Sequence, residues 1–327
     1  MEQAYHLNIL SRTGPLQKID NYRFGVATYL TLDQDLVISA GTDNRIRIWN
    51  WITGKEEKIF FADSHFDIQC MAISKDKTQL ATGHGSSGGV HMWDLITNKL
   101  IWCFPRKQSI HSVAFNADDS KIYMKHAFNT IMVFDAQDGK HLQTINDNPN
   151  SSSLSTFSMN GNTLYYFDAR VVRAMQTETG KELWGTSVKG NRRLILSHDG
   201  KYLALLNSSK QIQIVRTSDG AMGPLLDTDS ELMGEVDDLA LCFTHDNYHI
   251  LLAHGGKHLQ LWNIADQTLC IEYLLDDDSN FKDIIILADN QRFALGQRSG
   301  INYLGELSIP TDIDRSSLTW EPIRSYC

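Results

Sequence analysis

Proline is scarce in this chain of 327 residues, and long apolar runs and a recognisable signal peptide are absent from the sequence. There are 6 prolines, and no stretch approaches the roughly 20 consecutive apolar residues that a transmembrane helix needs. The sequence starts Met-Glu, with no basic segment ahead of an apolar one, so a signal peptide is not expected. These absences favour a globular protein without a transmembrane segment.

Paired cysteines are missing too. The five cysteines are Cys70, Cys103, Cys242, Cys270 and Cys327, and they form no Cys-x-x-Cys motif. An odd number of cysteines in a chain of this size argues against a disulfide framework. Free thiols are typical of a reducing compartment, so the expected location is the cytoplasm.

An excess of basic side chains is also absent. The 30 Lys and Arg residues are outnumbered by 39 Asp and Glu, which gives a formal net charge of −9. Phosphate backbones bind to basic stripes, and no long run of Lys and Arg occurs here. A nucleic-acid partner is therefore disfavoured.

A repeat runs through the chain. The segment IWNWITGKEEKIF (48–60), an apolar strand followed by a turn, returns in six later variants. Its anchor, Trp49, corresponds in order to Trp93, Phe134, Met175, Val215, Trp262 and Leu304. Successive anchors are 44, 41, 41, 40, 47 and 42 residues apart. This period indicates a fold built from repeated supersecondary units.

A second set of positions recurs with nearly the same period. Before each copy, a turn leads into another apolar strand, and one position of that turn is always Asp or Asn: Asp33, Asp76, Asp118, Asn160, Asp199, Asp246 and Asp289. These short side chains accept hydrogen bonds from backbone N–H groups just ahead, which favours a tight turn between strands. Each unit then has four short strands bounded by turn residues. The pattern predicts an all-β, seven-bladed β-propeller of four-stranded antiparallel blades.

The units resemble WD40 repeats over roughly residues 24–307. The Trp-Asp pair of that family is present as Trp93-Asp94, with the variants Trp49-Asn50, Trp262-Asn263 and Phe134-Asp135. The family also links its Trp to a strand Ser or Thr, a loop Asp and a His. The first unit has Ser39, Asp43 and Trp49 but no His, and the second has His65, Thr82 and Trp93 but no Asp. Because each unit lacks a member of that set, we expect the blades to be held more by packing than by polar relays.

A single propeller is expected over residues 1–327, monomeric on its own. Its blades are placed at about 24–61, 68–104, 111–145, 154–187, 193–226, 238–275 and 281–307, with a C-terminal extension at 308–327. The last unit shows three strands, so closing the ring requires a fourth. Residues 4–10 are the favoured donor and residues 316–323 the alternative.

Four motifs suggest chemistry but lack its context. Gly85–Gly89 fits G-x-S-x-G, yet it joins two strands, whereas a nucleophile elbow needs a following helix. Segment 174–184 resembles a quinoprotein repeat, except that Gln176 replaces the expected Asp. Arg192-Arg193 keeps half of the Phe-Arg-Arg-Gly motif of phosphoinositide-binding propellers. The fourth motif is a group of histidines, at His245, His249, His254 and His258, whose spacing along strands does not suit a metal site.

No catalytic residue, metal or cofactor is therefore assigned, and the resemblance implies a non-catalytic scaffold for a protein partner. The alternatives are a propeller enzyme (a quinoprotein-like oxidoreductase or a hydrolase) and a phosphoinositide-binding propeller. Loops between blades, and between second and third strands, share one face and are expected to bind the partner. Candidate contacts are the acidic Asp229, Glu231, Glu235, Asp276 and Asp277, and the basic or titratable Arg45, His65 and Arg192 across the ring. The acidic group is expected to attract a basic segment of the partner.

Overall fold

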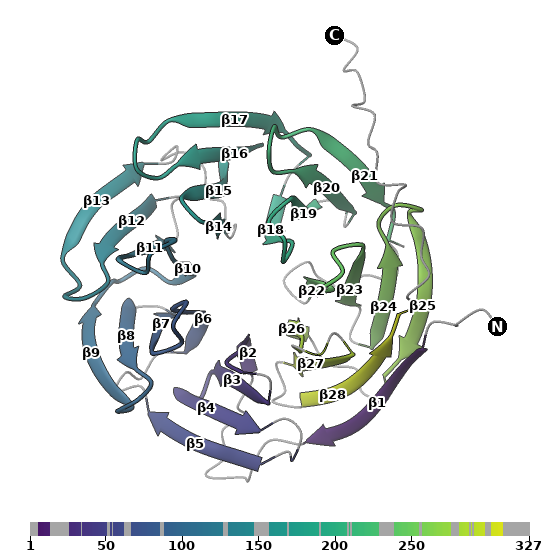
Figure 1. The fold of residues 1–327 in the computed structure, drawn as a ribbon, viewed down its shortest axis with the longest axis horizontal. Coiled ribbons are helices and arrows are strands. Elements are labelled where there is room, and N and C mark those ends of the chain that lie inside the picture. Colours follow the sequence, from purple (N-terminus) through teal and green to yellow (C-terminus); the bar gives the residue numbers. More distant parts are fainter. Residues whose placement is uncertain are drawn as a thin grey trace.

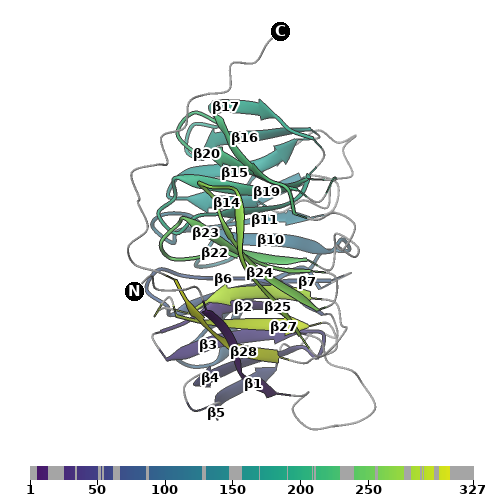
Figure 2. The same ribbon diagram turned by 90° about the vertical axis from the view of Figure 1, so that its right-hand side faces the viewer.

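The computed structural model describes residues 6–13, 26–33, 35–50, 53, 55–61, 67–85, 88–126, 130–146, 157–168, 170–189, 191–207, 209, 211–228, 239–254, 257–275, 281–287, 289, 291–297 and 302–309. Within these residues the regular structure is entirely strand, arranged as seven four-stranded sheets around a central opening (Figure 1). The predicted all-β, seven-bladed propeller is confirmed. Figure 2 shows the same ring edge-on.

The first four blades follow chain order. Blade 1 contains β2 (Val26–Thr31), β3 (Leu36–Gly41), β4 (Arg45–Asn50) and β5 (Lys55–Phe61). Blade 2 contains β6 (Ile68–Ile73), β7 (Gln79–His84), β8 (Val90–Asp94) and β9 (Lys99–Phe104). Blade 3 contains β10 (Ile110–Phe115), β11 (Lys121–His126), β12 (Thr130–Asp135) and β13 (His141–Asn146). Blade 4 contains β14 (Phe157–Asn160), β15 (Thr163–Asp168), β16 (Val171–Gln176) and β17 (Glu182–Ser187).

The last three blades bring the two ends of the strand order together. Blade 5 contains β18 (Asn191–Leu196), β19 (Tyr202–Asn207), β20 (Ile212–Arg216) and β21 (Met222–Leu226). Blade 6 contains β22 (Ala240–Phe243), β23 (His249–His254), β24 (His258–Asn263) and β25 (Thr268–Leu274). Blade 7 contains β26 (Phe281–Ile286), β27 (Arg292–Gln297), β28 (Asn302–Ser308) and, outermost, β1 (His6–Thr13). The pairing of β1 with β28 runs antiparallel from His6–Ser308 to Thr13–Asn302. The other proposed donor, 316–323, lies outside the described residues.

The hydrophobic core lies between neighbouring blades. Each adjacent pair shares its own cluster, such as that of Trp93 and Ile38 between blades 1 and 2. A second example is that of Phe134 and Met92 between blades 2 and 3. Trp93, Phe134 and Trp262 are buried, as expected for side chains that fill the space between sheets, whereas Trp49 is half-buried. Each blade therefore needs both of its neighbours to bury its two apolar sides.

Antiparallel strands place the connections on two different faces of the ring. We call the side that carries the connections between blades, and those between second and third strands, the loop face. We call the opposite side, with the turns between first and second and between third and fourth strands, the turn face. The anchoring Asp residues lie on the turn face, where Asp76 accepts hydrogen bonds from Ser74 Oγ at 2.7 Å and Thr78 N at 3.0 Å. These bonds hold the pKa of Asp76 below its ordinary value.

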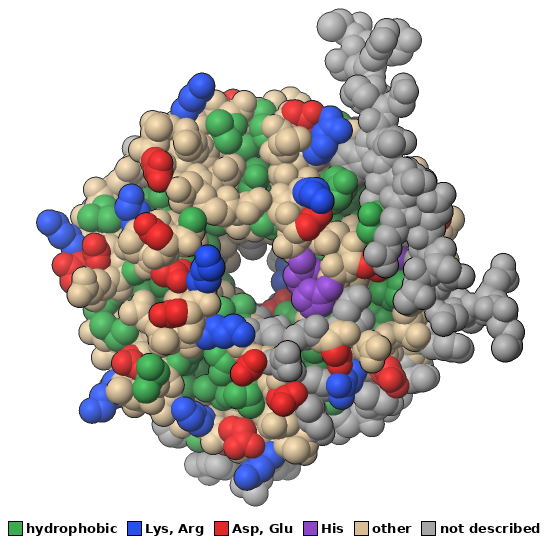
Figure 3. Space-filling view, viewed as in Figure 1, with side chains coloured by type: hydrophobic (Ala, Val, Ile, Leu, Met, Phe, Trp, Pro, Cys, Tyr) green, Lys and Arg blue, Asp and Glu red, His purple; other side chains and the backbone are tan. Residues whose placement is uncertain are grey.

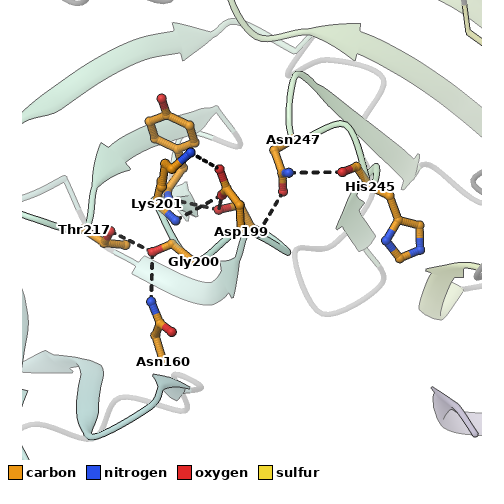
Figure 4. A network of polar contacts seen from close by, with 9 residues as sticks. Asn160, Asp199, Gly200, Lys201, Thr217, His245 and Asn247 are labelled. Atoms are coloured by element: carbon orange, nitrogen blue, oxygen red, sulfur yellow. Dashed lines mark hydrogen bonds and ion pairs between the residues drawn. The ribbon is translucent and has the colours of Figure 1, made fainter.

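Hydrogen bonds on the turn face also join one blade to the next (Figure 4). The Gly200 carbonyl of blade 5 accepts from Asn160 Nδ2 of blade 4 at 3.1 Å and from Thr217 Oγ1 of its own blade at 2.8 Å. Asp199 N donates to Asn247 Oδ1 of blade 6 at 3.2 Å. The Asp and Asn turns thus tie the ring together as well as reversing the chain.

Tryptophans on two outermost strands add a second kind of contact between blades. Trp102 Nε1 of β9 donates to Ala136 O of blade 3 at 2.8 Å, and Trp184 Nε1 of β17 donates to Thr217 O of blade 5 at 2.7 Å. Each indole lies across the turn between the third and fourth strands of the following blade. Segment 174–184, which resembled a quinoprotein repeat, thus ends in a tryptophan that joins two blades.

Polar relays accompany the packing in the first two blades. Trp49 Nε1 donates to Ser39 Oγ at 2.7 Å, and Trp93 Nε1 donates to Thr82 Oγ1 at 2.9 Å. The Thr82 hydroxyl is in turn 2.9 Å from Nε2 of His84, a residue outside the family pattern described above. A histidine at the end of the same strand therefore joins the relay of blade 2, because only the fold shows which ring reaches the hydroxyl.

Candidate interaction face

The predicted contact residues fall largely outside the described part of the chain. Asp229, Glu231, Glu235, Asp276, Asp277 and His65 are not among the described residues, and of Arg192 only the backbone, in β18, is described. Arg45 is described, at the start of β4 on the loop face. The grouping of the acidic residues on one sector therefore stays a prediction.

The turn beside Arg45 is organised by the carboxylate of Asp43, whose side chain is buried. Asp43 accepts a hydrogen bond from Arg45 N at 3.2 Å and pairs with the guanidinium of Arg47. Arg47 Nε also lies 3.5 Å from Glu56 Oε2 on β5. Asp43 thus stabilises the turn between β3 and β4 and binds Arg47 of its own blade. It takes no part in the hydrogen bond between Trp49 and Ser39.

Arg193 braces three blades near the central opening. Its guanidinium donates to Leu239 O of blade 6 and, at 3.2 Å, to Lys282 O of blade 7, and it lies 3.6 Å from Asp283 Oδ1. One member of the Arg192-Arg193 pair is therefore committed to structural contacts. This weakens the case for a paired-arginine phosphoinositide site, which needs both side chains.

Two of the described cysteines, Cys70 and Cys242, are poor nucleophiles. Burial raises the pKa of Cys70 to about 12, and burial also raises the pKa of Cys242. A thiol is a nucleophile mainly as its thiolate, so a raised pKa makes it inert near neutral pH. Cys70 and Cys242 thus behave as small apolar side chains between blades.

The histidines of blade 6 form separate contacts. His249 Nδ1 lies 3.0 Å from Asp246 Oδ2, and His258 Nδ1 lies 2.9 Å from Glu272 Oε1. The rings of His254 and His258 are stacked, with centroids 5.1 Å apart and planes 8° from parallel. In the part of the chain that the structure describes, no group of three or more His, Cys, Asp or Glu residues is arranged to hold a metal ion.

The buried Asp246–His249 pair makes a pH-dependent contribution to stability. Burial alone would lower the pKa of His249, but hydrogen bonds to Asp246 and Cys270 raise it from 6.5 to about 9. Because the pKa of His249 is higher in the folded state than in the unfolded state, its charged form stabilises the folded protein. This stabilisation is complete below about pH 6.5 and is lost as the pH rises through about 9. His249→Gln should therefore reduce the free energy of unfolding by roughly 1–3 kcal/mol near pH 6 and by much less above pH 9. Urea unfolding at both pH values measures the difference.

Blade 7 supplies a matched control for this experiment. Arg292 occupies the same place as His249, and its Nε pairs with Asp289 Oδ2 at 2.6 Å. Arginine stays protonated throughout this range, so the cost of Arg292→Gln should be the same at both pH values. An equal cost of His249→Gln at both pH values would show that the imidazole is not charged in the folded protein.

The view down the ring axis shows acidic and basic side chains interspersed over one face, with histidine side chains beside the central opening (Figure 3). On the turn face, His198 and His245 stack with centroids 4.0 Å apart. Their Nε2 atoms lie 3.1 Å from carbonyl oxygens of the next blade, those of Phe243 and Leu287. The pair is thus a further blade-to-blade contact.

Comparison with known proteins agrees with the geometry. The family described as "WD domain, G-beta repeat" matches residues 55–94, which run from β5 to the end of β8 and include Trp93-Asp94. The chain is a β-propeller of the WD40 kind. The chain is also 22% identical over 276 residues to apoptotic protease-activating factor 1 of Rattus norvegicus. That alignment covers 84% of this chain and 19% of the relative, so the chain spans about a fifth of the relative's length.

WD40 propellers are typically protein-interaction scaffolds and generally lack catalysis. In this WD40 propeller, two described glycines of the G-x-S-x-G motif lie between strands β7 and β8, where Gly85 N donates to Asp67 O at 2.7 Å and Gly88 N to Gly85 O at 3.0 Å. Among the described residues, no helix is long and apolar enough to cross a membrane.

Proposed function

We propose that this WD40 propeller is a non-catalytic scaffold, working as a monomer in the cytoplasm, that binds a segment of a protein partner on its loop face. The observation that carries the proposal is a contrast between the two faces. Five of the seven turns between first and second strands have five residues, at 74–78, 116–120, 197–201, 244–248 and 287–291. Connections between blades on the loop face instead range from three residues (188–190) to 13 residues (227–239). Uniform turns suit a structural role, whereas variable loops on a rigid scaffold suit recognition.

The longest of these connections suggests the chemistry of the partner. It contains DTDSELMGEVDD (227–238), with six acids and no base, and the next connection between blades includes Asp276 and Asp277. A basic segment of the partner would be drawn to this sector, because complementary charge speeds encounter and selects orientation. A bound partner segment of this kind requires no catalytic group in the ring.

Charge reversal tests the proposal. The triple variant Asp229→Lys, Asp276→Lys and Asp277→Lys should lose at least tenfold in affinity for a partner obtained by capture with the unaltered protein, mainly through slower association. The matched control reverses three exposed acids of the turn face, Asp138, Glu178 and Asp266, and should leave the affinity unchanged. Surface plasmon resonance at two salt concentrations measures both. Equal losses in the two variants would refute binding at the acidic sector.

A further inference from the structure

Four basic side chains gather at the inner corner of blade 3 on the loop face. Arg106 comes from the connection between blades 2 and 3, and Lys125 and His126 come from the end of β11. His111 is the extra residue of a bulge in β10, the strand beside the central opening (Figure 1). The register places Ile110 opposite His126 and Ser112 opposite Lys125, so His111 lies next to both.

Two of the four side chains of this basic corner are buried. Lys125 is fully buried, with Nζ donating to Phe167 O of blade 4 at 3.5 Å, and His126 is buried as well. Arg106 Nη2 lies 3.3 Å from His126 Nε2, so a guanidinium meets an imidazole. Charges held this far from water are costly unless an anion or strong hydrogen bonds compensate them.

The electrostatic field at His111 is positive. Burial lowers the pKa of His111, and the charges of Lys125 and His126 lower it further. Both of these neighbouring groups contribute positive charge, so the electrostatic potential around the imidazole of His111 favours the binding of an anion.

Two nitrogen atoms in this corner have no hydrogen-bond partner among the described residues. Arg106 Nε and His111 Nε2 are buried, and among the described residues neither makes a hydrogen bond. Buried polar groups are nearly always satisfied, so an unsatisfied pair within one basic corner indicates a missing ligand with acceptor atoms. Arg106 Nε is a donor in every protonation state, and His111 Nε2 becomes one when an anion favours the imidazolium.

Resting on the scaffold function proposed above, we propose that the basic corner formed by Arg106, His111, Lys125 and His126 binds the phosphoryl group of a phosphorylated side chain in the partner segment. A phosphoryl group carries a charge of about −1.5 to −2 at pH 7 and three acceptor oxygens. Such a group suits the guanidinium of Arg106 and the positive field at His111 better than a singly charged carboxylate does, and its oxygens can accept from both Arg106 Nε and His111 Nε2. Blade 3 lies across the opening from blade 6 (Figure 1). The segment would thus place its phosphoryl group at blade 3 and its basic residues near the acidic sector.

The test uses the full chain and three peptide libraries that share random flanks around a central phosphoserine, serine or glutamate. The phosphoserine library should be retained by the immobilised protein, and inorganic phosphate should compete with it. Arg106→Gln and His111→Gln should each weaken binding by about tenfold or more, since each removes a charge-assisted donor. Lys107→Gln is the matched control: it removes a basic side chain from the same connection at an exposed position and should change binding by less than about threefold.

The outcomes separate this inference from the proposed function. Equal retention of the serine library, unaffected by Arg106→Gln, would overturn the phosphoryl site and leave the scaffold function standing. Equal retention of the glutamate library would show that the corner reads carboxylates and would also overturn the proposal. A loss with Lys107→Gln as large as that with Arg106→Gln would reduce the site to general surface charge. Thermal unfolding confirms that each variant is folded, and His111→Gln provides the test if Arg106→Gln is not.

Discussion

Removal of residues 1–13 is expected to lower the melting temperature by roughly 10 °C and to broaden the transition. β1 is the outer strand of blade 7, and Leu7 packs in the cluster shared by blades 6 and 7, beside Leu307 and Phe293. Without β1 the ladder of β28 becomes an open edge, and apolar side chains behind it meet water. Because every blade depends on its neighbours, a weakened seventh blade loosens the ring on both sides. Differential scanning calorimetry measures the midpoint and the width.

The other end of the chain supplies the control. Removing residues 316–327 deletes the alternative donor strand, and this change should leave the transition as it was because β1 already pairs with β28. A milder variant, Leu7→Asp, keeps the strand but places a charge at a buried position. It should cost about 3 kcal/mol or more. A protein without residues 1–13 that melts like the parent would show that blade 7 does not need β1.

The architecture was predictable from the sequence because it depends on local signals that recur. Asp76, Asp118 and Asp246 stand at the same step and form the same turn, with the carboxylate accepting a backbone N–H two residues on, at 2.8–3.0 Å. A turn of this kind needs only its own five residues. Seven Asp or Asn positions in step with seven apolar third strands leave few folds other than a propeller.

The polar contacts were less predictable because they join residues far apart in the chain. Trp184 meets Thr217, 33 residues away, and Arg193 meets Lys282, 89 residues away. The path of β7 decides which histidine ring lies within hydrogen-bond distance of the Thr82 hydroxyl. The repeat pattern alone therefore could not predict that this histidine is His84. One signal was available: Trp102 and Trp184 both stand nine residues after their anchors, Trp93 and Met175.

The basic corner of blade 3 was missed for a related reason. Arg106, His111 and Lys125 are separated by 5 and 14 residues in the sequence, and no run of basic residues there indicates a positively charged site. They meet because a bulge in β10 shifts the register by one residue at His111. A bulge of this kind re-aims side chains and is hard to infer from apolar alternation.

Gly220→Ala is expected to destabilise the protein by about 3 kcal/mol, well above the cost of an ordinary glycine substitution. Gly220 has a φ of 72°, so a side chain there carries strain of roughly 1–2 kcal/mol. An alanine Cβ would also lie 2.5 Å from Cε3 of Trp184, the indole that bonds to Thr217. Forcing that ring aside disturbs the contact between blades 4 and 5 and adds about 1–3 kcal/mol. Equilibrium unfolding in urea measures the total.

Gly180 is the matched control for Gly220, because it occupies the same turn of blade 4 with a φ of 67° and a Cβ there would meet nothing within 4 Å. The blade before it has Gln143, not tryptophan, at the corresponding position of its outer strand. Gly180→Ala should therefore show the backbone strain alone, about 1 kcal/mol. Pairing Gly220→Ala with Trp184→Leu should recover part of the excess cost, because the smaller side chain removes the contact with the indole and leaves the one with Thr186 Oγ1, 2.6 Å from the added Cβ. Equal losses in the free energy of unfolding for Gly180→Ala and Gly220→Ala would mean that the Trp184 indole moves aside easily and does not hold blades 4 and 5 together.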